Sequence, residues 1–258
     1  MAGRDTLRGK HEIVHGSFLS QGDTESLWGW GTPAGRMRAR RRAELIARAA
    51  GLTHNARVLE VGCGTGVFTE YFAASGAQLI AVDISAELLE KARKRHLPVE
   101  QVLFKESRFE DCDIDGPFDA VIGSSVLHHL DIEAALAKML NLLKPGGFLC
   151  FAEPNAINPQ VFLMFRFRSY FPEVSPDENP FMRWRLKDKL ISAGFDIPKI
   201  IPFDWLHPAI PPPFISVVDK MGRVMEKIPF LREFAGSLLI CARRPSKCQF
   251  NKIGGIHV

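Results

Sequence analysis

The strongest constraint on the fold is an alternation of short apolar strands and amphipathic helices between residue 57 and about residue 153. The first strand, "RVLEVG", enters a loop with three glycines spaced two apart, and a helix follows this loop directly. Strands separated by helices pair in parallel, because each helix returns the chain across the sheet in a right-handed crossover. The pattern therefore predicts an α/β domain built on a parallel sheet.

Further strands are predicted at "LIAVD", "VEQVLF", "FDAVIG", "FLCFAE", "DIPKIIPFDWL" and "SLLICARR". The helix "VFTEYFAASG" is expected to close at Gly76, since glycine adopts a left-handed cap easily. Ser85 and Asp131 are expected N-caps of the next two helices, "SAELLEKARKRH" and "DIEAALAKMLNLL". Pro145 and two glycines are expected to halt the second of these, and Gly194 to stop "RLKDKLISAGF".

The 258 residues suit one decorated α/β domain, and their 46% hydrophobic content can fill its core. We expect an N-terminal lid or helical extension over residues 1–50 and the main α/β domain over residues 51–245. Aromatic and proline-rich segments predict substrate-side insertions at about 155–183 and 206–234, the second with apolar residues at helical spacing. Residues 246–258 are expected to form a tail.

The net charge of +4 comes from one short stretch. Residues 36–48 hold six arginines against one acid, Glu44, so the remainder of the chain is close to neutral. A local patch differs from the broad basic surface of a non-specific nucleic-acid binder. It is either a solvated helix face or a site for a phosphate or carboxylate.

The cysteines are odd in number and include no CxxC pair (Cys63, Cys112, Cys150, Cys241 and Cys248). This argues against a disulfide framework and against a zinc site, so no metal is expected. Free thiols suit a reducing compartment. The first thirty residues lack the apolar stretch of a secretion signal, and no apolar run reaches about eighteen residues. We therefore expect a cytoplasmic protein.

The glycine loop is suited to a cofactor, because a strand, a loop and a helix N-terminus place backbone N–H groups at the carboxyl edge of the sheet. Gly62, Gly64 and Gly66 are spaced one residue short of the dinucleotide fingerprint. Asp83 ends the second strand, where a carboxylate can accept hydrogen bonds from ribose hydroxyls. Together they predict a nucleoside-bearing ligand and do not require a pyrophosphate.

Residues 57–153 resemble the class I S-adenosylmethionine-dependent methyltransferases, especially the type 11 group that acts on small molecules and lipids such as quinone precursors. "VLEVGCGTG" is similar to the first motif of that family, "AVDIS" to the second, "FDAVIGSSVLHHL" to the fourth-strand motif and "LKPGG" to the turn before strand five. The resemblance implies a Rossmann-like, seven-stranded, mostly parallel sheet with helices on both faces and an antiparallel last strand. It implies S-adenosyl-L-methionine as the cofactor.

The resemblance also assigns roles at the cofactor. It implies that Glu60 positions the methionine part, that Asp83 grips both ribose hydroxyls and that Ile84 packs on adenine. After strand three the motif aligns ambiguously, so the acid at the adenine amino group is left open among Glu106, Ser107 and Asp111. The complete expected set is Trp30, Arg36, Glu60, Gly62, Cys63, Gly64, Gly66, Asp83, Ile84, Arg108, Phe109, Ser124 and Ser125.

A sulfonium donor is already activated, so alignment of a nucleophile behind the methyl group carries much of the rate. A hydroxyl or carbon acceptor also needs a base. His128 and His129 follow strand four, and Glu153 ends strand five, which makes these three the catalytic candidates. Each is also consistent with a buried structural residue or a helix cap.

Aromatic segments outside the core suggest the acceptor. Trp28, Trp30 and Arg36 are expected to close over the cofactor and its carboxylate, and the insertions to form an apolar roof. This combination predicts O- or C-methylation of a small-molecule, lipid or glycan-type acceptor, with peripheral membrane contact and no nucleic acid. Core packing explains the aromatic residues equally well.

Three other functions would use some of the same sequence features. An RNA-modifying methyltransferase could use the arginines, but "GSSVLHH" is not the proline-and-aromatic motif of amino-group DNA methylases, and no RNA-binding module is visible. A nicotinamide oxidoreductase shares the strand, loop and acid, but has a different glycine spacing. A non-catalytic cofactor-binding partner stays open, because the motif residues indicate only binding.

Overall fold

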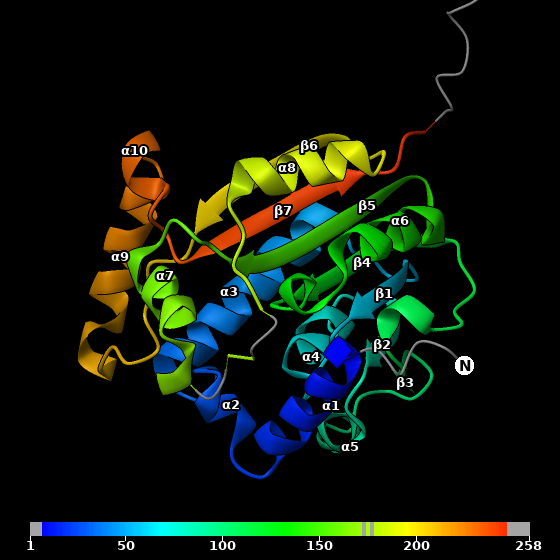
Figure 1. Cartoon of the computed structure of the whole chain (residues 1–258), viewed down its shortest axis with the longest axis horizontal. Helices are drawn as coiled ribbons and strands as arrows, with labels where there is room; N and C mark the ends of the chain where they lie inside the picture. Colours follow the sequence, from blue (N-terminus) through cyan, green and yellow to red (C-terminus); the bar gives the residue numbers. More distant parts are fainter. Residues whose placement is uncertain (1–6, 172–173, 176–177, 247–258) are drawn as a thin grey trace, which may run out of the picture.

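A computed structural model describes residues 7–171, 174–175 and 178–246. Seven strands form one sheet: β1 (Arg57–Val61), β2 (Gln78–Asp83), β3 (Val102–Glu106), β4 (Phe118–Ser124), β5 (Leu143–Pro154), β6 (Asp196–Phe203) and β7 (Ser237–Arg243). Their order is β3-β2-β1-β4-β5-β7-β6 (Figure 1). The pairs from β3 to β5 are parallel, and β7 is antiparallel to both of its neighbours. The predicted α/β fold with an antiparallel last strand is confirmed.

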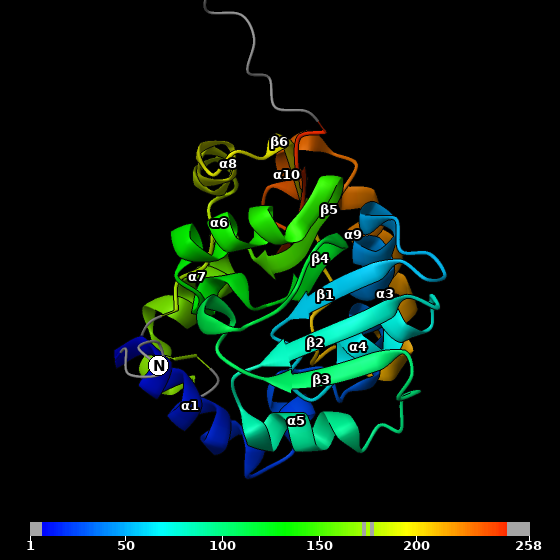
Figure 2. The ribbon, with the colours of Figure 1, turned by 90° about the vertical axis from the view of Figure 1, so that its right-hand side faces the viewer.

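Helices cover both faces of this sheet (Figure 2). On one face α3 (Pro33–Ala50) and α4 (Val67–Ala73) pack their buried residues, including Ile46 and Phe72, against β1, β2 and β4. On the other face α6 (Ile132–Leu142) and α8 (Arg183–Ser192) pack residues such as Leu136 and Leu190. The two layers follow from strand geometry, because successive side chains of a strand point to opposite faces.

Local sequence signals set the helix ends. The Ser85 hydroxyl accepts a hydrogen bond from Leu88 N at 3.3 Å at the start of α5 (Ala86–Arg93), and Asp131 caps α6 in the same way through Ala134 N. Both predicted N-caps are therefore confirmed. Gly76 has a φ of +79°, as expected for the end of the α4 segment. The "LKPGG" turn differs from the prediction, since it forms the irregular beginning of β5.

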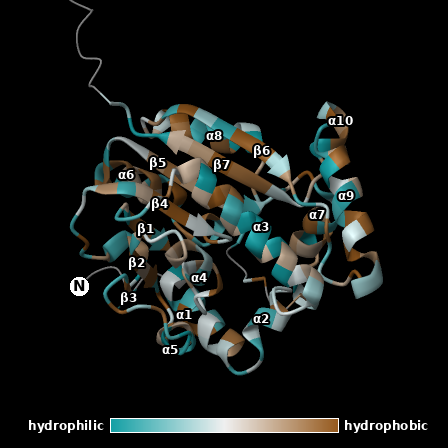
Figure 3. Cartoon of the chain, turned by 180° about the vertical axis from the view of Figure 1, so that it is seen from behind, coloured by the Kyte–Doolittle hydropathy of each residue, from teal (hydrophilic) through white to brown (hydrophobic). Residues whose placement is uncertain are grey.

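The N-terminal segment and the two insertions form the remaining elements. The segment before the core contains α1 (Leu7–Ser20) and α2 (Thr24–Leu27). The first insertion contains α7 (Pro159–Arg166) and the short helix η3 (Arg168–Tyr170). The second holds η4 (Pro212–Phe214), α9 (Ile215–Met225) and α10 (Pro229–Arg232), which Figure 3 shows on the outside of the molecule. Two further short helices, η1 (Phe109–Asp111) and η2 (Leu127–His129), follow β3 and β4.

Two observations bear on the expected compartment. Cys63, Cys112, Cys150 and Cys241 are free thiols, while Cys248 lies outside the described residues. Among the helices that the structure describes, none combines the length and the apolar character needed to cross a bilayer.

Candidate functional site

A cavity of about 960 Å³ lies at the carboxyl ends of β1, β2 and β4. Its walls come from the glycine loop, from α1 and α2 of the N-terminal segment and from both insertions. The volume is at the upper end of the ~300–1,000 Å³ that is usual for ligand pockets. Segments that are far apart in the sequence therefore enclose one site large enough for two ligands.

The glycines keep the loop backbone close to its neighbours. Gly62 has a φ of +68°, and a Cβ atom there would lie 2.2 Å from Val126 Cγ2. Gly64 has a φ of +52°, and its Cβ would lie 3.1 Å from the ring of Trp28. A side chain at Gly62 is thus excluded by Val126, two residues after β4, and a side chain at Gly64 is opposed by Trp28 of the N-terminal segment.

Asp83, at the end of β2, is held by the same loop. Its Oδ2 accepts from Gly64 N at 2.7 Å, and its Oδ1 accepts from Ser85 N at 2.9 Å. Burial raises the pKa of Asp83, while these two N–H groups act in the opposite direction. Each carboxylate oxygen can accept more than one hydrogen bond, so both stay available to ligand hydroxyls in the cavity.

Glu60 lies on β1 before the loop and is 1% exposed. Its Oε2 is buried without a hydrogen-bond partner. Burial, reinforced by the negative charge of Asp83, raises the pKa of Glu60 to about 8. Glu60 is therefore mostly a neutral acid at pH 7 in the empty site, and a ligand that brings a positive charge or an N–H donor near it would favour the ionised form.

Most of the other predicted cofactor residues line the same cavity: Trp30, Cys63, Ile84, Arg108, Phe109, Ser124 and Ser125. Gly66, Arg36 and Glu60 do not. Gly66 is the N-cap of α4, where a Cβ would lie 3.0 Å from Ala92 of α5, so its role is helix packing. Arg36 is exposed and donates to the Gly31 carbonyl, which corrects the prediction that it closes over the cofactor.

Arg42 occupies the cavity wall instead of Arg36. It is 3% exposed, and its guanidinium donates to the hydroxyls of Ser124, Ser125 and Ser237. It also lies over the Trp30 ring, 5.2 Å from the centroid. Burial lowers the pKa of Arg42 to about 10, so it is still a cation at neutral pH. A buried cation bonded to neutral hydroxyls is suited to an anionic group of a ligand.

The segment after β3 narrows the choice of residue that could contact the adenine amino group. Ser107 and Glu110 line the cavity, whereas Glu106 and Asp111 do not. Glu110 was not among the candidates, although its Oε1 accepts from Asp131 N at 2.9 Å and is thereby fixed in place.

Glu153 is fully buried behind the cavity and does not line it. Its Oε1 accepts from Val126 N and Leu127 N at 2.9 Å each, and its Oε2 lies 2.6 Å from His128 Nδ1. Glu153 therefore positions His128, and the prediction that it reaches the acceptor is not supported by this geometry.

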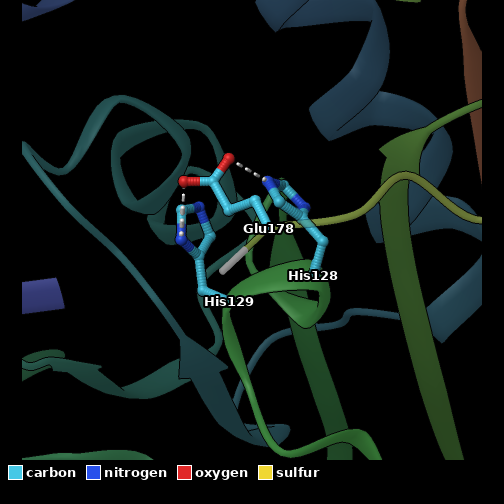
Figure 4. A group of neighbouring side chains, drawn as sticks. All are labelled: His128, His129 and Glu178. Carbon is cyan, nitrogen blue, oxygen red and sulfur yellow. Dashed lines mark ion pairs between the residues drawn. The ribbon is translucent and has the colours of Figure 1, made fainter. Parts of the chain in front are cut away.

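His128 and His129 both line the cavity and meet Glu178 from the first insertion (Figure 4). Burial disfavours the charged His128 ring, but Glu153 and Glu178 outweigh it and raise the pKa of His128 to about 10. His128 is therefore an imidazolium at neutral pH and cannot accept a proton. His129 Nδ1 lies 2.9 Å from Glu12 Oε2, on α1. Neither Glu12 nor Glu178 could be linked to the histidines from sequence spacing.

A family model described as "Methyltransferase domain" matches residues 59–149. The chain is 35% identical over 126 residues to the ubiquinone biosynthesis O-methyltransferase of Alkalilimnicola ehrlichii, which covers 47% of this chain and 51% of that protein. The chain thus matches about half the length of this curated relative. The residues that the family model matches contain the glycine loop, Asp83 and the histidine pair.

Solved structures share the fold over most of the chain. The N-methyltransferase NodS of Bradyrhizobium japonicum, in complex with S-adenosyl-L-homocysteine, superposes with a TM-score of 0.63 at 16% identity and covers 91% of this chain and 99% of its own. The [4+2]-cyclase SpnF superposes with a TM-score of 0.62 at 18% identity, over 94% and 97% of the two chains. A methyltransferase and a cyclase share this fold, so the fold alone does not identify the reaction, and the evidence must come from the residues of the site.

Proposed function

We propose that this chain, which carries a class I S-adenosylmethionine-dependent methyltransferase domain, transfers a methyl group to an oxygen of a small, largely apolar acceptor. The observation that supports this most is the contact of the glycine loop with Asp83 in the wall of a cavity large enough for two ligands, with Glu60 buried directly before that loop. The likeness to an O-methyltransferase of ubiquinone biosynthesis supports oxygen as the methylated atom.

The residues present fit the cofactor. Asp83 would accept the ribose hydroxyls. Glu60, which is buried directly before the loop, would be ionised more readily once the positively charged methionine end is bound nearby. Arg42 would hold the carboxylate, the role that the sequence suggested for Arg36. Bound there, S-adenosylmethionine supplies a methyl group that needs no further activation. The task of the protein is then to align the acceptor and exclude water.

His129 is the side chain best placed to take a proton from an acceptor hydroxyl. Its side chain is 24% exposed and lines the cavity, whereas His128 is already protonated and Glu153 is shut away. Glu12 would hold the Nδ1–H of His129, which leaves Nε2 as the acceptor of the proton.

The remaining part of the cavity is walled mainly by apolar groups from the two insertions. These include Val161, Met164, Phe165, Phe171, Trp205 and Leu206. Such a wall suits an aromatic or isoprenoid-bearing acceptor better than a nucleic acid, which would require an exposed basic track.

The test is calorimetric titration with S-adenosylhomocysteine, with NAD as the control ligand, followed by transfer of labelled methyl from S-adenosylmethionine to a panel of catechols and phenols. We expect micromolar binding of S-adenosylhomocysteine, no binding of NAD, and label on oxygen. Binding without transfer to any hydroxyl, but with transfer to an amine, would move the proposed acceptor atom to nitrogen. Binding of NAD alone would refute the proposal.

The outer side of α9 supports a contact of the protein with an anionic membrane. Here the "α9 face" means the exposed apolar residues Phe214, Val217, Met221, Val224 and Phe230, each 57% exposed or more. Exposed Lys220 and Lys227 flank it. Apolar groups beside cations are typical of interfacial helices, and Pro208 and Ala209, just before α9, line the cavity. An acceptor could thus pass between bilayer and cavity.

We expect the protein to co-sediment with phosphatidylglycerol vesicles and much less with phosphatidylcholine vesicles. Replacing Met221 and Val224 with glutamate should lower the bound fraction at least about tenfold, since each charge opposes insertion. Val99→Glu is the matched control, because Val99 is 83% exposed elsewhere on the surface. Equal sedimentation of all three proteins would contradict the membrane contact.

A further inference from the structure

The side chains of His128, His129 and Glu178 converge in the cavity, with the carboxylate placed between the two rings (Figure 4). Nε2 of His128 lies 3.5 Å from Glu178 Oε2, and Nδ1 of His129 lies 3.3 Å from Glu178 Oε1. The ligand atoms of all three residues lie within 4.8 Å of one another. Two imidazoles and a carboxylate form a donor set that binds zinc and similar divalent ions.

The separations suit coordination better than hydrogen bonding. Good N–H···O hydrogen bonds span about 2.7–3.2 Å, so contacts of 3.3 and 3.5 Å are long for this purpose. Two ligand atoms at about 2.1 Å from a tetrahedral zinc ion lie about 3.4 Å apart. The contacts of Glu178 with the two rings are therefore spaced as they would be around one ion.

The surroundings of His128 support the same interpretation. Its Nδ1 lies 2.6 Å from Glu153 Oε2, and the other oxygen of Glu153 is fixed by two backbone N–H groups. A buried carboxylate that holds one ring nitrogen, while the other nitrogen faces a ligand site, is the usual support of a metal-binding histidine. Glu153 thus directs Nε2 of His128 towards Glu178.

Glu12 brings a further carboxylate to this cluster from α1. Its Oε2 lies 2.9 Å from His129 Nδ1, and its Oε1 accepts from Ser175 Oγ at 3.2 Å. Ser175 also fixes Glu178, by donating its N–H to Oε1 at 2.8 Å. Glu12, Glu153 and Glu178 bring three negative charges, against the His128 imidazolium and the guanidinium of Arg8, whose Nη2 donates to the His128 carbonyl at 2.7 Å. The remaining negative charge favours a cation between the carboxylates.

We propose that the two histidines after β4, together with Glu178, bind one divalent ion such as Zn²⁺ beside the Glu12 carboxylate. The ion displaces the Nε2 proton of His128 to solvent, faces the cavity and keeps its fourth position open for the oxygen of the acceptor. This role, though not the binding itself, rests on the proposed methyl transfer: coordination lowers the pKa of the acceptor hydroxyl, whose proton passes to solvent. His129 then acts as a ligand, and the ion replaces it in activating the hydroxyl. The expectation of no metal site rested on cysteine spacing alone.

The full chain, stripped with a chelator, is titrated with ZnCl₂ and separately with MnCl₂ in the absence of cofactor and acceptor. We expect one Zn²⁺ per chain by calorimetry and by elemental analysis after gel filtration. Glu178→Gln and His129→Ala should each weaken Zn²⁺ binding at least tenfold, and Glu153→Gln should weaken it about 10–100-fold through His128. His54→Ala is the matched control, because His54 is exposed and lies outside the cavity.

Thermal unfolding and S-adenosylhomocysteine binding of each variant show that the fold is retained. The proposal is overturned if Zn²⁺ does not saturate at one ion per chain, or if the cluster variants bind it as tightly as His54→Ala. Saturable Zn²⁺ binding in a protein that transfers no methyl group would leave the metal site standing and refute the proposed function. Methyl transfer that is unaffected by chelation, in a protein that binds no Zn²⁺, would support the proposed function and refute the metal site.

Discussion

Replacement of Asp83 by alanine is expected to weaken S-adenosylhomocysteine binding at least about 100-fold. The carboxylate is placed to accept two ribose hydroxyls, and each hydrogen bond to a charged group contributes about 1.5–3 kcal/mol. The substitution also releases Gly64 N, which Asp83 Oδ2 holds at 2.7 Å, so the loop loses part of its preorganisation. Calorimetric titration gives the two dissociation constants directly.

Asp113→Ala is the control for the loss of an acid, because Asp113 is exposed and does not line the cavity. Its affinity should equal that of the parent protein. Asp83→Asn keeps one oxygen acceptor, so its affinity for S-adenosylhomocysteine should lie between those of Asp83→Ala and the parent protein. An Asp83→Ala protein that binds S-adenosylhomocysteine normally would overturn the assignment of the ribose site, and unchanged thermal unfolding would show that the comparison is valid.

Arg42→Met should weaken S-adenosylhomocysteine binding about 30- to 5,000-fold while leaving 5′-methylthioadenosine almost unaffected. Loss of one partner of a buried charge pair costs about 2–5 kcal/mol, and only the first ligand carries the carboxylate that Arg42 would pair with. Methionine keeps much of the side-chain length beside Trp30. The ratio of the two affinities is therefore the measured quantity.

Arg36→Met provides the matched comparison, since Arg36 is on the same helix but exposed. We expect its affinity for both ligands to equal that of the parent protein. Equal losses for both ligands in Arg42→Met would indicate a damaged pocket, and a selective loss in Arg36→Met would restore the prediction from sequence.

The choice of Arg42 over Arg36 as the cavity arginine depends on how α3 packs in the folded protein. Residues four apart on a helix share a face, so Arg38 and Arg42 point the same way. Arg36 is three residues before the buried Ala39 and seven before the buried Ala43, so helical spacing alone does not separate it from the buried side of α3. The buried alanines could have revealed the phase of this helix, but the sequence does not say which face meets the cavity.

The alternation of strands and helices, the N-caps at Ser85 and Asp131, and the meeting of the glycine loop with Asp83 could all be predicted from the sequence. These features depend on residues that are close in the chain, or on the rule that parallel strands end at one edge of the sheet. The partners of His128 and His129 could not be predicted in this way. Glu12 and Glu178 reach them from α1 and from the first insertion, and no local pattern encodes such contacts, because they form only when those segments pack over the end of β4.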